Sequence, residues 1–409
     1  MAEKPVIRYA EFTDTWEQRK LEEYIKTSQE KNEDNKFGKQ DVLSVSGDVG
    51  IVNQIEFQGR SFAGVSVANY GVVHHGDVVY TKSPLKSNPF GIIKTNQGRD
   101  GIVSTLYAVY KPKENTDSRF VQIYFENDYR LNHYLHPLVN KGAKNDMKIS
   151  ADNALKGLVV FPSSKDEQAQ ISDLFAEIGH LFTLHQHEFD KMVSIKKAML
   201  EKMFPKTGEN KPEIRFAGFT DAWEQRKVDE LAEQCIGGGT PSTTKSEYWN
   251  GSLPWIQSSD LTENILFNVA PRKRITEAGL LKSATKLVAA GSIAVITRVG
   301  VGKLAYMPYV YATSQDFLSL SKLKADGQFV VYALYQMIQK ELHNVQGTSI
   351  KGITKDELLQ KTVIIPRNSD EQAQIGKFFH SLDNLITLHQ RELEKLQNIK
   401  KALLEKMFV

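Results

Sequence analysis

The chain has 409 residues, of which 41% are hydrophobic and 25% are charged, a composition typical of a globular protein that excludes a disordered one. A single cysteine, Cys235, excludes both a disulfide framework and a zinc finger of thiolates. The formal net charge of +3 is modest for a dedicated nucleic-acid binder. Because no apolar stretch approaches the roughly 18 residues of a membrane span, we expect a soluble, cytoplasmic protein without membrane contact.

An internal repeat dominates the chain. Segment 10–20 recurs at 217–227 with nine of eleven residues identical, and segment 159–204 recurs at 363–408 with 25 identities in 46 positions. The stretches between these matched ends share little similarity. Solenoid and propeller repeats have periods of about 20 to 50 residues, so a period near ~200 residues indicates a duplicated pair of domains. Random drift would have spread the differences evenly along the two copies of the repeat. The similar ends and the divergent middles of the copies are therefore under different constraints.

Both divergent middles contain short β-like runs, turn residues and a few helical segments. In chain order the pattern predicts strands at 76–80 and 102–110, a helix at 119–140, strands at 158–161, 291–297 and 317–320, a helix at 328–343 and a strand at 363–365. The middles are therefore expected to be globular α/β or α+β domains.

The matched C-terminal parts of the repeat are predicted to be long helices, at 166–204 and 370–408. Apolar residues recur in them with heptad spacing. A single helix of this length cannot bury its apolar stripe alone, so the two stripes are expected to pack together. Because each helix is entered from its own globular domain, we predict an antiparallel pair with a pseudo-twofold axis.

The start of each long helix carries a recognisable cap. Ser164 and Glu167 have the spacing of a capping box, and so do Asn368 and Glu371 in the second copy. The first helix is expected to end at Pro205, where a polar linker begins. The predicted layout of this α+β chain is a globular domain at 1–160, a long helix at 161–204, a linker at 205–216, a second globular domain at 217–362 and a C-terminal long helix at 363–409.

Polar residues interrupt the apolar stripe near the middle of each helix. These are His185 and Glu188 in the first copy and His389 and Glu392 in the second. In an antiparallel pair they would meet, and a polar layer of this kind fixes register and orientation. Alternatives are a partner-binding surface or a metal site with four ligands. Known carboxylate sites in bundles use two further helices, so we expect no metal.

The sequence contains no recognisable catalytic constellation. Residues 300–303 lack the spacing and the Ser or Thr of a phosphate-binding loop, so a hairpin turn is expected. The glycine-rich segment 237–241 is either a loop whose amides approach a phosphate or a plain connector. The basic run 272–274 is either a solvated face or a phosphate contact. No Gly-x-Ser-x-Gly elbow appears, and Cys235 has no flanking signature of a nucleophile.

Basic and polar residues in the loops of both middles are candidates for contacts with DNA. Lys and Arg suit phosphate positioning, and Ser, Thr and Gln suit hydrogen bonds to base edges. The candidates in the first middle are Lys82, Lys86, Lys94, Arg99, Lys144 and Lys148, and those in the second are Thr240, Ser242, Lys245, Arg298, Lys303, Gln315, Ser349 and Lys351.

Several of these motifs together resemble the specificity subunit of type I restriction-modification systems. They are Phe-Thr-Asp-x-Trp-Glu-Gln-Arg-Lys before each middle, Gly-Gly-Gly-Thr-Pro-Ser at 237–242, Pro254-Trp255, and a proline followed by Asp-Glu-Gln-Ala-Gln-Ile at each long helix. The resemblance covers essentially the whole chain. Its most specific part is the repeated helix ends, because the middles are expected to differ between family members.

The resemblance implies a non-catalytic reader of double-stranded DNA. Two target-recognition domains would each read one half of a split, asymmetric sequence, while the helices set the spacer and dock two methyltransferase subunits, to which motor-nuclease restriction subunits can add. No cofactor is expected in this chain; the methyltransferase would use S-adenosylmethionine, and the motor ATP with magnesium. The low net charge predicts weak DNA binding by the isolated chain. The alternative is a helical assembly scaffold that binds only proteins.

Overall fold

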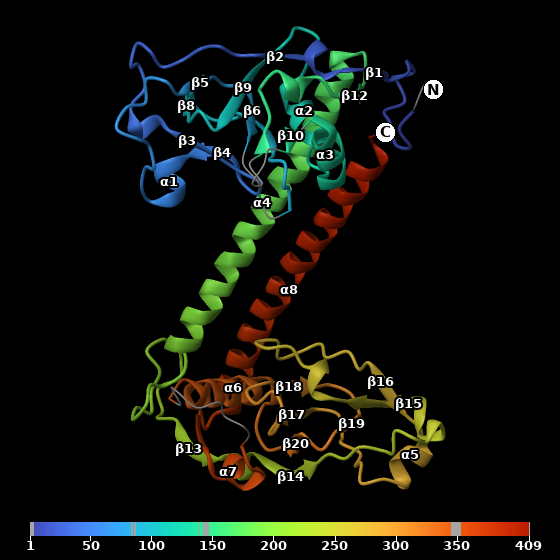
Figure 1. The fold of residues 1–409 in the computed structure, drawn as a ribbon. Helices are drawn as coiled ribbons and strands as arrows, with labels where there is room; N and C mark the ends of the chain where they lie inside the picture. The colour runs from blue at the N-terminus through green and yellow to red at the C-terminus, as the bar shows by residue number, and fades with distance from the viewer. Residues whose placement is uncertain are drawn as a thin grey trace. The chain divides into compact units, whose positions relative to one another are not determined.

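The computed structural model describes residues 4–82, 85, 87–138, 140–141, 147–344 and 353–408. The chain divides into two compact units: unit 1 comprises Met1–His185 and Glu392–Val409, and unit 2 comprises Gln186–Arg391. The two long helices, α4 (Lys165–Lys202) and α8 (Ser369–Lys406), each contribute to both units (Figure 1). The boundary between the units therefore falls within the helices, whereas the predicted layout placed domain boundaries at the helix ends.

Unit 1 is built on a four-stranded antiparallel sheet of order β2-β9-β6-β7. Its strands are β2 (Ile25–Thr27), β9 (Tyr107–Pro112), β6 (Val78–Thr81) and β7 (Ile93–Thr95). The described residues of unit 1 also form two-stranded sheets: β1 (Glu17–Lys20) with β12 (Leu158–Phe161), β3 (Leu43–Ser46) with β4 (Gly50–Asn53), β5 (Gly71–Val73) with β8 (Gly101–Val103), and β10 (Asn140–Lys141) with β11 (Met147–Lys148). The short helices are α1 (Gln54–Gln58), α2 (Ser118–Tyr124) and α3 (Asp128–Leu135).

Unit 2 also has a four-stranded antiparallel sheet, of order β14-β20-β17-β18. Its strands are β14 (Ala232–Gly237), β20 (Phe317–Leu323), β17 (Ser292–Ile296) and β18 (Leu304–Met307). The other sheets are β16 (Lys273–Ile275), β15 (Trp249–Ile256) and β19 (Ala312–Thr313) in that order, and β13 (Glu224–Lys227) with β21 (Thr362–Ile365). The helices are α5 (Glu277–Leu281), α6 (Gly327–Asn344) and α7 (Lys355–Gln360).

The two four-stranded sheets have the same topology although their sequences diverge. In unit 1 the amide of Lys82 donates to the Leu106 carbonyl at 3.1 Å, and in unit 2 the amide of Thr297 donates to the Asp316 carbonyl at 2.7 Å. Both donors directly follow the equivalent strands, β6 and β17. Thr297 therefore occupies the position of Lys82, and the loops of the two units can be compared residue by residue.

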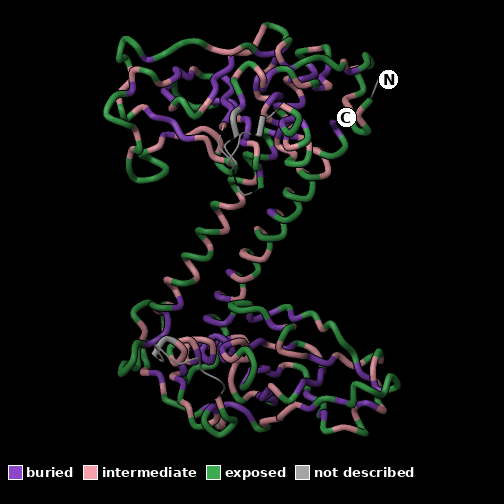
Figure 2. Tube along the Cα trace, in the orientation of Figure 1, coloured by how far each residue is buried: buried purple, intermediate pink, exposed green. Residues whose placement is uncertain are grey.

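In both units the two long helices complete the hydrophobic core. Ile171 and Phe175 of α4 share the core of unit 1 with Phe408, which follows α8. In unit 2, Phe204, which follows α4, lies 5.9 Å from the ring of Phe379 on α8. Residues at the start of one helix thus pack with residues at the end of the other, and the helices run antiparallel, as predicted (Figure 1). Along both helices exposed and less exposed residues alternate, as expected for one packed face (Figure 2).

The predicted capping boxes form only in part. Ser164 Oγ accepts a hydrogen bond from the Glu167 amide at 3.3 Å, and Asn368 Oδ1 accepts one from the Glu371 amide at 3.4 Å. The carboxylate of Glu167, however, accepts hydrogen bonds from Arg8, at 2.6 and 2.7 Å, instead of reaching back to the cap. The glutamate is thus part of a buried cluster, which the sequence motif alone does not reveal.

Two elements of unit 1 that were predicted as continuous are each divided in two. The predicted helix at 119–140 is divided into α2 and α3, because the Asn127 side chain caps α3 by accepting from the Arg130 amide at 3.0 Å. The predicted strand at 102–110 is divided into β8 and β9 by a turn in which the Tyr107 amide donates to the Ser104 carbonyl at 3.0 Å. The predicted strands at 158–161, 317–320 and 363–365 and the helix at 328–343 are present.

Candidate nucleic-acid interface

Three loops lie together at one end of the four-stranded sheet in unit 2. Strand β14 ends at Gly237, which pairs with Leu318 near the start of β20, and β17 ends at Ile296, which pairs with Phe317. Because these strands are antiparallel, the segments that follow β14, precede β20 and follow β17 meet at the same edge. These segments, 238–241, 314–316 and 297–303, are here called the loop edge of unit 2.

Four of the predicted DNA-contacting residues lie on the loop edge of unit 2. Thr240, Arg298 and Gln315 are exposed, and Lys303 is half-buried. The Thr240 hydroxyl donates a hydrogen bond to Oε1 of Gln315, so residues 75 positions apart are in direct contact. Residues 300–303 form a hairpin turn between β17 and β18, as predicted, with positive φ at Gly300 and Gly302.

The glycine-rich segment before Thr240 is a rigid support. The Gly239 carbonyl accepts hydrogen bonds from Trp255 Nε1 at 3.0 Å and from Thr285 Oγ1 at 2.7 Å. A Cβ atom on Gly238 would collide with the Ser314 carbonyl oxygen, so no larger residue fits there. The amide of Gly239 donates to the Thr313 carbonyl at 2.8 Å. That amide is therefore committed within the protein, which favours a structural connector over a phosphate-binding loop.

A fourth loop reaches the same edge, and its residues are not among those predicted from the sequence. Strands β15 and β19 are parallel, with Ile256 opposite Thr313, so the segments that follow them lie together. Gln257 and Ser259 follow β15, and Gln257 Nε2 donates to Ser259 Oγ at 3.0 Å. The only signal in the sequence is a short polar run after Pro254-Trp255, which many surface loops share.

The remaining described candidates of unit 2 lie beside this edge and have local partners. Lys245 Nζ donates to the Tyr248 hydroxyl at 3.2 Å, and Ser242 Oγ lies 2.9 Å from Thr244 Oγ1. In the basic run 272–274, Lys273 lies over the ring of Trp249 at 5.6 Å. Ser349 and Lys351 lie outside the described residues.

Unit 1 presents the equivalent edge with different side chains. Lys82 follows β6 at the position that Thr297 holds in unit 2. Burial, and secondarily the nearby charge of Lys31, lowers the pKa of Lys82. In the described parts of the chain neither lysine has a carboxylate within ion-pair distance. Two neighbouring cations without a compensating carboxylate form a surface that attracts a phosphate group.

The other candidates of unit 1 are less suited to DNA. Lys94 is 12% exposed and lies 3.9 Å from Glu126, and burial lowers its pKa, so it is less accessible to DNA than the other candidates and its assignment stays a prediction. Arg99 is exposed and pairs with Glu56 at 3.1 Å. Lys86, Lys144 and the side chain of Lys148 lie outside the described residues.

The four polar residues at the helix centres are half-buried. Glu188 lies 3.5 Å from Lys191, and Glu392 lies 3.7 Å from Lys395, so each carboxylate has a lysine partner one turn along its own helix. Among the residues that the structure describes, no group of three or more His, Cys, Asp or Glu side chains is arranged to hold a metal. The proposed role of His185 and His389 in fixing register stays a prediction.

Each unit also has a depression along the second half of a long helix. In unit 2 a groove of about 650 Å³ is lined by α6, α8 and residues of α4 that include Lys197 and Leu200. In unit 1 a depression of about 430 Å³ is lined by α8 residues that include Lys401 and Leu404. These pairs occupy matching positions of the repeat, offset by 204 residues. The same helix surface is thus uncovered in both units.

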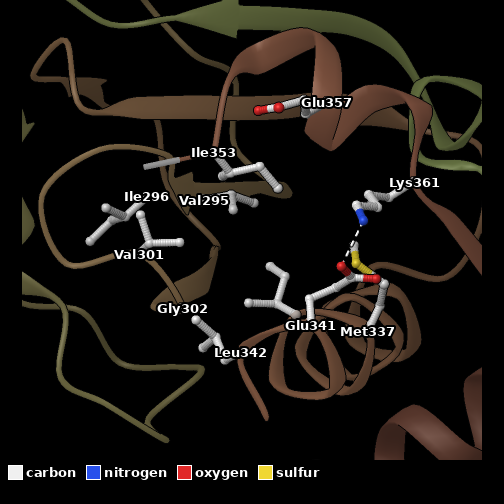
Figure 3. Close-up of a pocket in the computed structure, with 11 residues that line it drawn as sticks. Val295, Ile296, Val301, Gly302, Met337, Glu341, Leu342, Ile353, Glu357 and Lys361 are labelled. Atoms are coloured by element: carbon white, nitrogen blue, oxygen red, sulfur yellow. Dashed lines mark hydrogen bonds and ion pairs between the residues drawn. The ribbon is translucent and has the colours of Figure 1, made fainter. Parts of the chain in front are cut away.

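A smaller pocket of about 250 Å³ lies behind the 297–303 hairpin in unit 2 (Figure 3). Its walls are mainly apolar, with Val301 on one side and Met337 on the other. Glu341 at its rim is paired with Lys361 at 2.6 Å. The lining offers no pairing of nucleophile and base for catalysis.

Comparisons with known proteins show what the chain is similar to. Residues 220–398 match the model of the type I restriction modification DNA specificity domain. The chain is 27% identical over 192 residues to the type I restriction enzyme MjaIX specificity subunit of Methanocaldococcus jannaschii, covering 46% of this chain and 44% of that one. It is 22% identical over 306 residues to the putative MjaX specificity subunit of the same organism, covering 72% and 68%.

A solved structure has a similar fold. The crystal structure of the type I restriction-modification S subunit from M. genitalium matches with a TM-score of 0.64 over 100% of this chain and 99% of that one, at 12% identity. By sequence, the chain is similar to type I specificity subunits. The MjaIX match extends over less than half of that relative. In the described part of this chain, no helix is both long and apolar enough to cross a membrane.

Proposed function

We propose that the chain reads DNA sequence as the specificity subunit of a type I restriction-modification complex. Each unit would read one half of a split, asymmetric target in double-stranded DNA. The observation that carries this proposal is the pair of loop edges: one sheet framework presents Lys31 and Lys82 in unit 1 but Thr240, Arg298 and Gln315 in unit 2. A common framework with different exposed polar groups suits two different half-sites.

The long helices would connect the two units that recognise DNA. Because α4 and α8 each run through both units, their fixed length would set the spacer between the half-sites. The matched helix surfaces around Lys197 and Lys401 would each dock one methyltransferase subunit. Near-identity of these helix ends is expected if both copies bind the same partner, and divergence of the middles is expected if they bind different DNA.

Catalysis would belong to the partners of this chain. The methyltransferase subunits would bind S-adenosylmethionine, and restriction subunits that join the complex would use ATP with magnesium. The candidate side chains at the loop edges are cations, hydroxyls and amides, which position and read DNA without breaking bonds. A non-catalytic role for this chain is the proposal that fits this chemistry.

Methylation mapping in cells tests the proposal. The chain would be expressed with its cognate methyltransferase subunit, and genomic DNA would be sequenced at single-molecule level for N6-methyladenine. We expect a new split motif, of which only one half changes when residues 228–362 are exchanged for those of a relative. A stable complex that produces no new motif would favour the protein-binding scaffold instead.

A further inference from the structure

Gln315 is exposed, but hydrogen bonds on both sides fix the backbone that carries its side chain. The neighbouring residue Ser314 donates its amide to the Ile256 carbonyl at 2.9 Å. On the other side, the Asp316 carbonyl accepts from the Thr297 amide at 2.7 Å and from the Thr297 hydroxyl at 3.1 Å. The backbone that carries Gln315 is therefore fixed on both sides, while its side chain faces solvent.

The side chain itself is oriented by Thr240. The Thr240 hydroxyl donates to Gln315 Oε1, and Thr240 follows Gly239, whose carbonyl is bound by Trp255 and Thr285. A carboxamide oxygen has two acceptor positions and its nitrogen carries two N–H groups. The bond from Thr240 occupies one acceptor position, and within the described part of the chain the other acceptor position and both donors are free for another molecule. The amide is pre-oriented for a two-point contact.

We propose that Gln315 is a specificity-determining residue that reads an adenine in the half-site bound by unit 2, and that Thr240 is its positioning residue. A glutamine amide matches adenine in the major groove, because its oxygen accepts from N6 and its nitrogen donates to N7. No other base pair offers that donor and acceptor in the same order. This inference rests on the proposed function, since it names the residue through which unit 2 would read DNA.

The neighbouring side chains support the choice of Gln315. The amide of Gln257 is engaged by Ser259 on its own loop, whereas Arg298 is a cation suited to a phosphate or a guanine. In unit 1 the position equivalent to Gln315 is Thr105, which is exposed and carries no amide. The two units would therefore read different bases from the same place in the fold.

The test uses the intact complex with the methyltransferase subunit and maps the methylated motif. Replacing Gln315 with alanine is expected to relax one adenine in the half-site of unit 2 by at least about tenfold, with the other half-site unchanged. Gln315→Glu is expected to disfavour the adenine too, since a carboxylate cannot donate to N7. Thr240→Val is expected to relax the same position in part, and Thr240→Ser is expected to restore it.

A matched control is available on another sheet of unit 2. Gln225 on β13 is exposed and donates from Nε2 to Thr362 Oγ1 at 2.9 Å, so it is a second glutamine–threonine pair away from the loop edge. Gln225→Ala is expected to leave the motif and the methylation rate unchanged. An unchanged motif in Gln315→Ala, or a relaxed position that is not adenine, would overturn the assignment while leaving the proposed function intact.

Loss of methylation in Gln315→Ala would still be informative. In that case the unmodified complex would be tested for binding to duplexes that differ at one adenine of the half-site. Equal affinity for all of them would overturn the assignment, and at least a tenfold loss at one adenine would support it. If the unmodified complex methylates no motif at all, the proposed function fails before Gln315 is tested.

Discussion

Glu167 and Glu371 occupy equivalent places in the first turns of α4 and α8, and both carboxylates are 1% exposed. Glu167 accepts hydrogen bonds from Arg8 and from Trp16 Nε1, and Glu371 accepts them from Arg215 and from Trp223 Nε1. The repeated tryptophan and the repeated Asp-Glu-Gln motif are therefore two sides of one junction. Its conservation between the copies follows from its role in joining each globular domain to its helix.

Neutralising one of these glutamates is expected to destabilise its unit. Glu371→Gln leaves the largely buried Arg215 guanidinium without its ion-pair partner, and breaking a buried pair from one side costs about 3 kcal/mol. Urea denaturation of the full chain measures the change in the free energy of unfolding. Glu394→Gln on the exposed side of α8 is the control and should stay within about 0.5 kcal/mol of the unmodified chain. Equal stability of both variants would contradict a structural role for the junction.

Reversing the charge of Lys197 or Lys401, on the two matched helix surfaces, is expected to remove one bound methyltransferase subunit each. Lys197 and Lys401 are exposed at equivalent positions of the repeat. If each surface docks one methyltransferase subunit, Lys197→Glu should leave a complex with one copy, and the double variant with Lys401→Glu should leave none. Native mass spectrometry gives the stoichiometry directly.

The control for this series is Lys377→Glu on α8. Lys377 is also exposed, but the first copy has Asp173 at the matching position, so a site repeated in both copies cannot depend on a lysine there. This variant should retain both partner copies. If the double variant Lys197→Glu with Lys401→Glu also retains both, docking occurs elsewhere.

The sequence predicted the parts of the fold that depend on local pattern and repetition. The heptad stripes and flanking prolines placed both long helices within a few residues, because an apolar stripe of that length has few other solutions. The continuity of 119–140 was predicted incorrectly, because the cap at Asn127 is a side-chain hydrogen bond that hydrophobic periodicity does not register.

The candidate interface was predictable only by residue type. Thr240, Arg298 and Gln315 were chosen because their side chains suit DNA, yet their proximity depends on strand order, which one sequence does not reveal. Lys94 had the right chemistry, but it lies on β7 beside Glu126 instead of in a loop. Gln257 and Ser259 were missed because the parallel pairing of β15 with β19 brings them to the edge.

A histidine in unit 1 is expected to give the stability of the chain a measurable pH dependence. Hydrogen bonds to Asp100 and then to Glu30 raise the pKa of His74, and His74 in turn helps to lower the pKa of both carboxylates. Lys111 also pairs with Glu30, and the buried Asp77 accepts from the His74 amide. The network is therefore strongest when His74 is protonated and Glu30 and Asp100 are ionised.

The signs of these shifts define a pH window. Stability from His74 is fully present below its unfolded pKa of about 6.5 and is lost as the pH rises through its raised folded value. Stability from the carboxylates is present above about pH 4.5 and is lost as the pH falls through their lowered folded values. Thermal denaturation should show His74→Gln destabilising the chain more at pH 6 than at pH 8.5. The effect should stay below about 1 kcal/mol because these side chains are partly exposed.

The neighbouring His75 provides the control for this measurement. Its exposed ring lies 3.2 Å from the Gly98 carbonyl, and no carboxylate pairs with it in the described part of the chain. His75→Gln should therefore change stability equally at both pH values. An identical pH profile for the two variants would show that the His74 network contributes nothing.

The isolated chain is expected to bind DNA only weakly. Its net charge is +3, so it would release few counterions from DNA, and Lys82, Lys31 and Arg298 would supply only a few phosphate contacts. Fluorescence anisotropy at physiological salt should give a Kd no tighter than about 10⁻⁶ M for the chain alone, the range of non-specific binding. Binding should tighten when the methyltransferase subunits add their own phosphate contacts. In the complex, Lys82→Ala should weaken DNA binding by the same factor for all sequences. Nanomolar, sequence-specific binding by the isolated chain would contradict this division of roles.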